Sequence, residues 1–574
     1  MIQPLRYHAL ACDFDGTIAW NGNVDGATVA ALHRLRKSGR KLILVTGREL
    51  DDLINKFSDL QLFDRVVAEN GAVVYLPTTG DQFVLGDAPP AAFVNDLHQR
   101  GVGPISVGDV IIATWHPHEA AVLDTIEQHG LEHHVVFNKG AVMVLPAGVN
   151  KATGLRFALQ QLRISPRNTV CVGDAENDQT MFQDCEIAIA VNNALATVKA
   201  NADLVTHGHH GAGVVELIDR LATNDLSDVG GCLHRHDVLL GRQHGGEPVV
   251  INPYDTRMLL AGAPRRGKSW LATGLIERLT AHGYQVCVID PEGDYGTIPD
   301  IIHIGDSNQP PSVEELARLL ESPTHSVVAN LLALPFADRP EFLTLLCGSV
   351  HDLRKRTGRP HWLVIDEAHH LLPQHEAMTC AEPLATAPGV LLITVHPEHL
   401  ASEALHAMNV VLAVDPVPSE TLDAFAERTG QICPETPQVT LGAGEAVVWD
   451  IRGGIPPVKF HAATCRSRHL RHRRKYAEGD IGWERSFYFT GPANRQYPRA
   501  HNLIAFLAIG DDVDDETWIY HARRGDYSRW IRDAIGDYQL ADCVTSVEAS
   551  PHLPADELRR LTRQAIEQRY TLPA

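Results

Sequence analysis

The stretch Gly262-Ala263-Pro264-Arg265-Arg266-Gly267-Lys268-Ser269 has the spacing G-x-x-x-x-G-K-[ST] of a loop that cradles phosphate groups. A short apolar run, expected to be a buried strand, precedes it, and an expected helix from Trp270 to Leu279 follows. Gly262 and Gly267 would let backbone N–H groups point at phosphate oxygens, and the helix would add its positive N-terminal end. Lys268 would reach the β- and γ-phosphates, while the Ser269 hydroxyl would bind Mg²⁺. The stretch therefore predicts a strand–loop–helix unit of an α/β domain that binds a nucleotide.

Further along the chain, an apolar strand is expected at residues 361–365, directly before Asp366 and Glu367. An acidic pair at a strand end can be an ordinary solvated strand exit. In a domain that already carries a phosphate loop, the same pair favours nucleotide hydrolysis. Asp366 would hold the Mg²⁺ shell, and Glu367 would polarise the attacking water.

This middle part, residues 226–465, resembles the HerA/FtsK group of ring-forming ATPases. The resemblance rests on the phosphate loop, an additional strand followed by Asp290-Pro291-Glu292-Gly293-Asp294-Tyr295, the Asp366–Glu367 pair and Leu441–Ala446. It implies a RecA-like P-loop domain with ATP as cofactor. It also implies a homo-oligomer, a hexameric ring with ATP at the subunit interfaces.

Two features of this resemblance stay open. The group takes an arginine finger from a neighbouring subunit, and Arg339, Arg428 and Arg452 are all candidates. The group often carries a glutamine after its fourth core strand to sense the γ-phosphate, whereas this chain has Thr394-Val395-His396 at that place. Sensing of the γ-phosphate would then be altered, or turnover would be slow.

The beginning of the chain carries a second set of phosphate-directed residues at expected strand ends. A strand expected at residues 7–12 delivers Asp13 and Asp15, two carboxylates that leave the strand on the same side. One of them can attack phosphorus while the other moves a proton. A second expected strand ends at Thr46, whose hydroxyl suits a phosphoryl oxygen.

Later positions complete this set. Lys151 opens an amphipathic helix and places a cation near its start. A third expected strand, at residues 169–172, ends before Asp174 and Asp178, which add carboxylates for Mg²⁺.

A nucleophile, a hydroxyl, a lysine and metal-binding acids in this order resemble the haloacid dehalogenase (HAD) phosphatase superfamily. Glu69-Asn70-Gly71 and Gly211-Ala212-Gly213 further resemble its Cof-type branch. The resemblance implies a Rossmann-like domain over residues 1–225 with an inserted α+β cap at about 80–145. It implies these roles: Asp13 as the nucleophile that forms an aspartyl-phosphate, Asp15 as the general acid/base, Thr46 and Lys151 on the phosphoryl group, and Asp174 and Asp178 on Mg²⁺ with Asp13 and the Asp15 carbonyl. A degenerate phosphatase fold used as a scaffold is the alternative, but no catalytic residue is missing.

Length and composition limit the number of domains and the classes of protein that fit the chain. A chain of 574 residues suggests roughly three or four domains, and 44% hydrophobic and 21% charged residues are typical of a soluble globular protein. The formal net charge of −21 argues against a surface that wraps DNA broadly, although it leaves room for a narrow basic channel. No apolar run could span a membrane, no signal-peptide layout opens the chain, and the ten cysteines include no C-x-x-C pair. We therefore expect a cytoplasmic protein. Its 31 histidines show no metal-binding spacing, so most are expected at the surface or in the core.

Residues 466–574 are expected to form a small, mostly helical domain for assembly or partner binding. Its basic run, Arg466 to Lys475, would contact phosphate backbones or an acidic neighbour, or would be a solvated linker helix. Most aromatic residues between Phe487 and Trp530 are expected in its core. The acidic run 511–516 is expected to be a solvated turn or helix start, because nothing completes a Ca²⁺-loop spacing.

Three functions from different classes fit these motifs. The favoured one is a two-activity enzyme, an Mg²⁺-dependent phosphatase joined to a ring-forming ATPase. In its sharper form, the ring grips or moves DNA or another nucleic acid, and the phosphatase processes a terminal phosphate. The second is a phosphatase for a small phosphorylated substrate such as a sugar phosphate, with the ATPase ring as a regulated scaffold. The third is a module in which ATP hydrolysis switches partner assembly, in nucleic-acid surveillance or defence.

Overall fold

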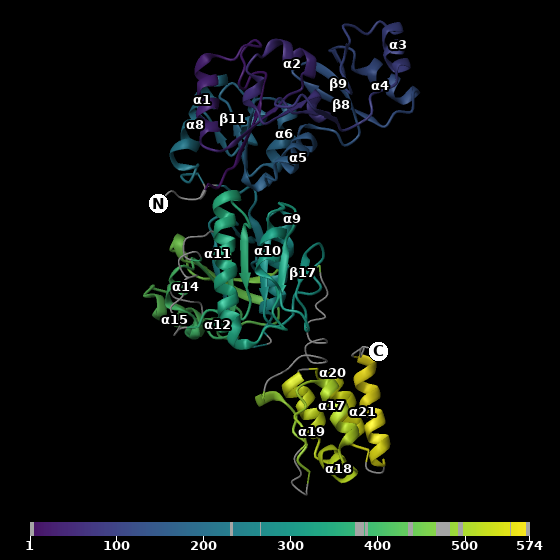
Figure 1. The fold of residues 1–574 in the computed structure, drawn as a ribbon, viewed down its shortest axis with the longest axis vertical. Helices are drawn as coiled ribbons and strands as arrows, with labels where there is room; N and C mark the ends of the chain where they lie inside the picture. Colours follow the sequence, from purple (N-terminus) through teal and green to yellow (C-terminus); the bar gives the residue numbers. More distant parts are fainter. Residues whose placement is uncertain are drawn as a thin grey trace.

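The computed structural model describes residues 5–229, 233–264, 266–373, 384, 389–433, 440–466, 483–491, 497–535, 537–550 and 553–569. Three bodies follow one another along its long axis (Figure 1). We call them the first unit (residues 5–229), the middle unit (233–466) and the last unit (483–569). Within the described ranges, no helix is both long and apolar enough to cross a lipid bilayer.

The first unit is an α/β unit with one large sheet. Its strands are β1 (Ala9–Asp13), β2 (Lys41–Val45), β3 (Arg65–Ala68), β4 (Val73–Tyr75), β5 (Gln82–Val84), β10 (Thr169–Gly173), β11 (Ile187–Ala190) and β12 (Leu204–Val205). Its helices are α1 (Gly26–Lys37), α2 (Leu50–Lys56), α5 (Lys151–Leu162), α6 (Gln179–Asp184), α7 (Ala196–Ala200) and α8 (His210–Asn224). The strand order is β12-β11-β10-β1-β2-β3-β4-β5, with β1 parallel to both neighbours. Because α1 and α8 pack on one face and α5 and α6 on the other, β1 is buried along its whole length.

A smaller α+β body is inserted between β5 and α5. It contains α3 (Ala91–Gln99), β6 (Ser106–Val107), β7 (Ile112–Trp115), α4 (Glu119–Gln128), β8 (His133–Asn138) and β9 (Ala141–Pro146). The antiparallel sheet β6-β7-β9-β8 is covered by α3 and α4, which bury their apolar side chains on it. This body, the cap, therefore has its own small core. β5 pairs with β4 in the large sheet, so the inserted body begins after Val84.

The middle unit is built on a sheet of eleven strands. They are β13 (Val238–Arg242), β14 (Pro248–Ile251), β15 (Arg257–Ala261), β16 (Val286–Asp290), β17 (Ile302–Ile304), β18 (Val327–Asn330), β19 (Trp362–Ile365), β20 (Val390–Thr394), β21 (Val410–Ala413), β22 (Glu445–Asp450) and β23 (Val458–Ala462). Their order is β14-β13-β23-β22-β21-β15-β20-β19-β16-β18-β17. The seven strands from β21 to β17 are parallel, and the other four add an antiparallel flank.

Helices cover both faces of this sheet. They are α9 (Lys268–Ala281), α10 (Val313–Leu320), α11 (Arg339–Thr357), α12 (Ala368–Leu371), α14 (Ser402–His406) and α15 (Pro418–Thr429). α9 packs on one face, and α10, α11 and α15 pack on the other. Burial on both faces explains why β15, β16, β19 and β20 are nearly continuous apolar runs in the sequence.

The last unit is helical within the part of it that is described. Its helices are α17 (Leu503–Asp512), α18 (Asp515–Arg523), α19 (Asp526–Trp530), α20 (Tyr538–Glu548) and α21 (Ala555–Arg569). They surround an aromatic core that includes Phe506, Trp518 and Tyr527. Apart from Arg466, the basic run expected at 466–475 lies outside the described residues.

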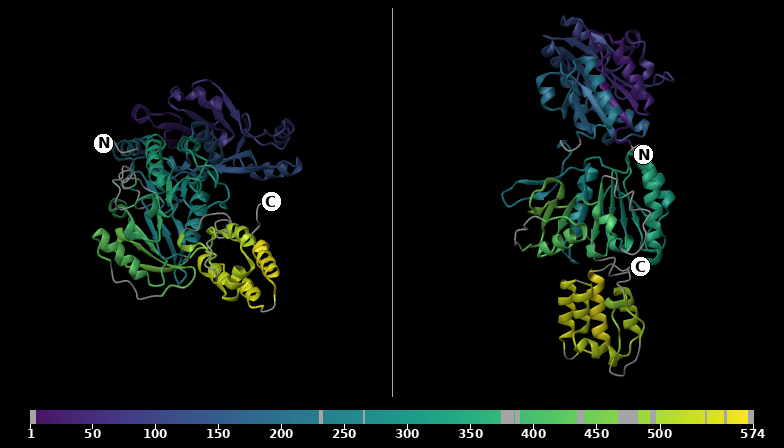
Figure 2. Two further views of the ribbon diagram at one scale, coloured as in Figure 1. Left: turned by 60° about the horizontal axis from the view of Figure 1, so that its bottom comes forward. Right: turned by 90° about the vertical axis from the view of Figure 1, so that its left-hand side faces the viewer.

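The first and middle units touch at the amino ends of their sheets. Glu186, directly before β11, accepts hydrogen bonds from the hydroxyl of Tyr284, shortly before β16, at 3.0 and 3.2 Å. The ring of His361, directly before β19, lies 3.1 Å from Oδ1 of Asn168, directly before β10. The parallel strands of both sheets begin near this contact and run away from it toward their carboxyl ends. The carboxyl edges of the two sheets therefore face opposite ends of the pair (Figure 2).

Candidate active site

Two neighbouring parallel strands of the first unit bring predicted carboxylates together. β1 ends at Asp13, and its partner β10 ends immediately before Asp174. Asp13, Asp174 and Asp178 each offer one carboxylate oxygen, and these oxygens lie within 4.8 Å of one another. Three hard oxygen donors at this spacing fit a divalent cation such as Mg²⁺.

Lys151 joins two of these carboxylates. Its Nζ donates to Oδ1 of Asp13 and to Oδ1 of Asp178, both at 2.6 Å, and its side chain is 1% exposed. Asn150 caps the helix that Lys151 opens, with reciprocal hydrogen bonds to Thr153. Although burial opposes its charge, Asp13 and Asp178 raise the pKa of Lys151. The lysine is therefore held as an ammonium at a fixed place.

Backbone groups also hold the loops after β10 and β1 in place. Oδ2 of Asp178 accepts from the N–H groups of Asp174 and Ala175 at 2.8 and 2.9 Å. Gly16 adopts a φ of +88°, and a Cβ at this position would lie 2.2 Å from Oδ2 of Asp174. Only glycine lets the loop after β1 approach Asp174 this closely.

The buried carboxylates repel one another. Burial and the nearby charge of Asp178 raise the pKa of Asp13 to about 8, against the opposing effect of Lys151. A divalent cation would screen this repulsion, which agrees with the chemistry of the donor set.

Asp15, the predicted acid/base, pairs with an arginine. Arg48 donates from Nε and Nη2 to the two oxygens of Asp15 at 2.5 and 2.6 Å, and from Nη1 to Asp52 at 2.7 Å. Thr46 is buried at the end of β2, and its hydroxyl accepts from the Arg48 N–H at 3.1 Å. Asp15 must leave Arg48 before it can transfer a proton to or from a substrate. The sequence predicts the roles of Thr46 and Asp15, but no pattern in it predicts Arg48 as their partner.

The cap contributes a residue that no sequence motif predicts. Lys139, at the turn between β8 and β9, places its Nζ 2.7 Å from Oδ2 of Asp174 and 3.5 Å from the carbonyl oxygen of Asp15. These are oxygens that the sequence analysis assigned to Mg²⁺, so the ammonium and the cation cannot share them in this arrangement. Asn138-Lys139-Gly140 between two apolar runs indicates a hairpin, but nothing in the pattern says where the hairpin tip docks.

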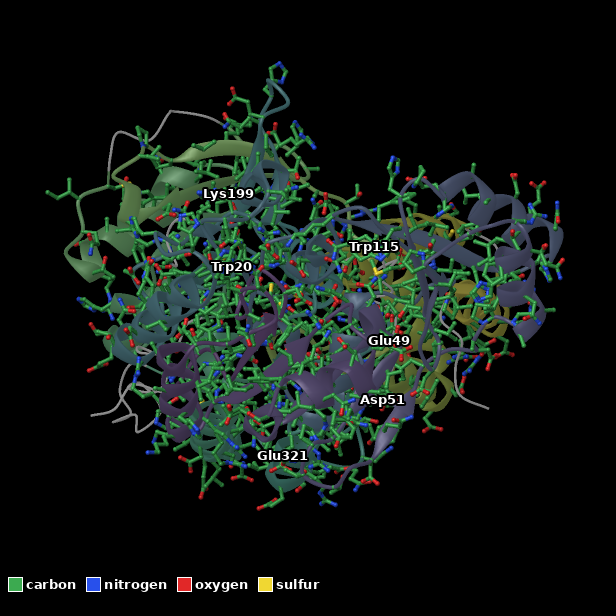
Figure 3. All side chains as sticks on the ribbon, turned by 90° about the horizontal axis from the view of Figure 1, so that it is seen from above. Trp20, Glu49, Asp51, Trp115, Lys199 and Glu321 are labelled. Carbon is green, nitrogen blue, oxygen red and sulfur yellow. The ribbon has the colours of Figure 1, made fainter. Side chains whose placement is uncertain are left out.

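Aromatic side chains lie at the far end of the first unit. Figure 3 looks onto this end and labels Trp20, from the loop after β1, and Trp115, from the cap strand β7. They are 60% and 54% exposed. Both the core and the cap therefore present an exposed indole at the end that faces away from the middle unit.

In the middle unit, the predicted phosphate loop follows β15. Gly267 adopts a φ of +90° and opens α9, where Lys268 and Ser269 form the first turn and are buried. The Nζ of Lys268 donates to the carbonyl oxygens of Gly262 and Ala263 at 2.6 and 3.0 Å. The lysine thus closes the loop on itself. Arg265 lies outside the described residues.

The predicted acidic pair lies at the same edge of this sheet. β20 separates β15 from β19, and all three are parallel, so Asp366 after β19 and the loop after β15 share the carboxyl edge. Asp366 is buried, and Glu367 has a left-handed φ of 44°, which is uncommon outside glycine. Burial and the charges of Asp294 and Asp366 raise the pKa of Asp290, at the end of β16, to about 7. The carboxylates of Asp290, Asp294 and Asp366 therefore gather at this edge, and Glu367 directly follows Asp366.

The three arginines proposed as fingers lie in different places. Arg339, at the start of α11, is close enough to Asp290 for their charges to interact. Arg428 donates to a backbone carbonyl in the loop before α14. Arg452 pairs with Asp255, shortly before β15, at the opposite edge from the phosphate loop. Within a single chain, Arg339 thus interacts with an acidic residue at the predicted nucleotide edge, whereas Arg452 lies at the opposite edge.

Comparison with known proteins identifies the first unit. A profile of haloacid dehalogenase-like hydrolases matches residues 10–99 and 106–218. Through that segment the chain belongs to this family. The segment forms a Rossmann-like α/β fold, and its activity is that of a HAD-type phosphatase. HAD phosphatases generally use Mg²⁺, which agrees with the cluster of Asp13, Asp174 and Asp178.

The relatives cover a limited part of the chain. The phosphoglycolate phosphatase of Natronomonas pharaonis is 29% identical over 226 residues, which are 38% of this chain and 98% of the relative. The phosphoglycolate phosphatase of Haloarcula marismortui is 30% identical over 220 residues, 36% of this chain and 95% of the relative. A HAD subclass IIB sugar phosphatase of known structure is 21% identical, covers 37% of this chain and 98% of its own, and gives a TM-score of 0.33.

Proposed function

We propose that the first unit hydrolyses the phosphomonoester of a small, anionic metabolite, with phosphoglycolate as the first candidate. The observation that carries this proposal is the buried contact of Lys151 with Asp13 and Asp178 beside Asp174. Two further facts support the substrate class. The similar phosphatases act on phosphoglycolate, and the Lys139 ammonium of the cap reaches the same place.

In this proposal, the Asp13 carboxylate attacks phosphorus. A new O–P bond forms, and the bond to the leaving oxygen breaks as Asp15 donates it a proton. Asp15 then takes a proton from water, which attacks the aspartyl-phosphate and releases phosphate. Lys151 neutralises the carboxylates while Thr46 hydrogen-bonds a phosphoryl oxygen. Mg²⁺, held by Asp13, Asp174, Asp178 and the Asp15 carbonyl, would withdraw charge from the phosphoryl oxygens.

A phosphate-release screen tests this proposal. Phosphoglycolate, sugar phosphates, nucleotides and 3′- or 5′-phosphorylated oligonucleotides would be compared, with Asp13→Asn as the control. We expect the highest kcat/KM for a small phosphorylated acid. Preference for an oligonucleotide end would instead favour the nucleic-acid function. Phosphate release by Asp13→Asn at the wild-type rate would rule out Asp13 as the nucleophile.

We also propose that the middle unit hydrolyses ATP in a ring similar to those of the HerA/FtsK group. The observation that favours it is the shared carboxyl edge of the loop after β15 and of Asp366 and Glu367 after β19. Lys268 would give up its hydrogen bonds to the loop carbonyls and bind the β- and γ-phosphates. Ser269 and Asp366 would hold Mg²⁺, and Glu367 would polarise water. Gly262 and Gly267 would open the loop to the phosphates.

The ring remains part of this proposal. A hexamer would place an arginine of one subunit at the nucleotide of the next. Molar mass from light scattering, measured with and without a slowly hydrolysed ATP analogue, tests it. A hexamer with the analogue supports the ring, whereas a monomer under both conditions contradicts it.

The ring has two candidate uses. As a scaffold, it would regulate the phosphatase; as a motor or switch, it would bind DNA. DNA binding whose affinity falls steeply with salt, together with DNA-stimulated ATP turnover, would favour the second use.

A further inference from the structure

Histidines from two loops gather at the carboxyl edge of the middle sheet. His369 and His370 lie in α12, after β19, and His396 and His399 follow β20. The ring centres are 3.9 Å apart for His369 and His370, 5.5 Å for His369 and His396, and 4.9 Å for His396 and His399. The segments that follow β19 and β20 thus form one imidazole cluster, because the two strands are neighbours.

Part of this cluster has the spacing of metal ligands. Glu367, His369 and His370 each offer one ligand atom, and the three atoms lie within 4.8 Å of one another. Tetrahedral zinc bonds of 2.0–2.1 Å place ligand atoms about 3.4 Å apart, so small side-chain rotations would complete the geometry. His396 is next to His369 and is the nearest candidate for a fourth ligand.

A neighbouring hydroxyl orients one member of this triad. Nδ1 of His369 lies 3.1 Å from the Thr394 hydroxyl and 3.6 Å from Oε2 of Glu367. The side chain of His369 is 7% exposed and that of Glu367 is 18% exposed. The triad is therefore partly buried, and it differs from a group of solvated surface side chains.

We propose that Glu367, His369 and His370 form a binding site for a borderline divalent cation of the zinc class. Two imidazoles and one carboxylate suit Zn²⁺, whereas Mg²⁺ prefers an all-oxygen set. The site is thus chemically distinct from the carboxylate cluster of Asp13, Asp174 and Asp178.

The site has a consequence that rests on the proposed ATPase function. A Glu367 carboxylate that ligates Zn²⁺ shares its negative charge with the cation and becomes a weaker base toward the attacking water. Occupancy therefore inhibits ATP turnover without preventing nucleotide binding at Lys268.

The binding test uses the full chain, stripped of metal and titrated with Zn²⁺ in excess Mg²⁺ without nucleotide. We expect one tight site, weakened at least about tenfold by His369→Gln and by His370→Gln separately. His406→Gln, an exposed histidine of α14, and Asp174→Ala, in the other cluster, should retain it. Unchanged Zn²⁺ affinity in both cluster variants overturns the site.

A second measurement does not depend on the folding of the variants. Co²⁺ bound to the wild-type chain in excess Mg²⁺ should give the intense visible absorption of a four-coordinate site with mixed nitrogen and oxygen ligands. Weak, six-coordinate absorption at one equivalent of Co²⁺ overturns the proposal.

The inhibitory effect is tested separately by ATP turnover with and without one equivalent of Zn²⁺. Turnover that falls in the wild type and much less in His370→Gln supports it; equal turnover with bound Zn²⁺ overturns the link. A chain without ATP turnover would refute the proposed ATPase and leave the binding result intact.

Discussion

The two phosphate-directed sites differ in how complete they are within one chain. In the first unit, Lys151 already bridges Asp13 and Asp178 at 2.6 Å. In the middle unit, Lys268 bonds to the carbonyls of its own loop, and β20 separates that loop from Asp366. The first site is assembled by the fold of one chain, whereas the site proposed for the middle unit would need a nucleotide to draw Lys268 away from its loop carbonyls. The two sites also lie at opposite ends of the paired sheets, so they should work independently.

The largest expected effect comes from Asp13→Asn. Loss of a nucleophile should lower the kcat of phosphate release by about 10⁴-fold or more, because the amide cannot form the aspartyl-phosphate. ATP turnover should stay at the wild-type rate. Phosphate release and ATP turnover measured on the same preparation check this, and a variant that loses both activities would break the comparison.

Lys268→Ala and Glu367→Gln should have the converse effect. Each should lower ATP turnover by about 10²–10³-fold, because each removes a charge contact made in the transition state. Phosphatase kcat/KM should not change. Undiminished ATP hydrolysis in both variants would eliminate the proposed ATPase, and reduced phosphatase activity would show coupling across the contact of the two units.

Lys139→Met sharpens the description of the first site. Without the ammonium near Asp174, Mg²⁺ should activate the enzyme at a lower concentration, while the KM for an anionic substrate should rise about tenfold. Mg²⁺ titrations and substrate saturation curves measure the two effects. Unchanged values of both would mean that the cap lysine does not compete with the cation or contact the substrate.

The smallest expected effect is that of Tyr284→Phe at the contact of the two units. Loss of the hydrogen bond to the buried Glu186 carboxylate should lower the free energy of unfolding by about 1–3 kcal/mol. Arg167 and Arg6 still pair with Glu186, so its charge keeps partners. Denaturant unfolding checks the stability. Neither activity should change at a temperature where the variant is folded, and a selective loss of one activity would contradict this.

Much of the first site could be predicted because its residues occur at strand ends. The apolar runs before Asp13, Thr46 and Asp174 predict parallel strands, and parallel strands bring their carboxyl ends to one edge. The contacts of Arg48 with Asp15 and of Lys139 with Asp174 could not be predicted in this way. They depend on side-chain directions and on where the cap docks, and neither leaves a periodic pattern in the sequence.

Prediction from the sequence is limited in the same way for the middle unit. The loop at 262–269 and the acids after 361–365 could be read from local patterns. The position of β20 between β15 and β19 could not, since strand order is set by long-range packing. For the same reason, the histidines lacked any metal-binding spacing in the sequence, although β19 and β20 bring His369 and His396 together.

The central claim is that two independent phosphate chemistries occupy opposite ends of the paired first and middle units. The most direct measurement compares phosphoglycolate and ATP hydrolysis by the wild type, Asp13→Asn, Lys268→Ala and the double variant. We predict that each single variant loses only its own activity and that the double variant loses both. Loss of both activities in either single variant, or retention of both in the double variant, would contradict the claim.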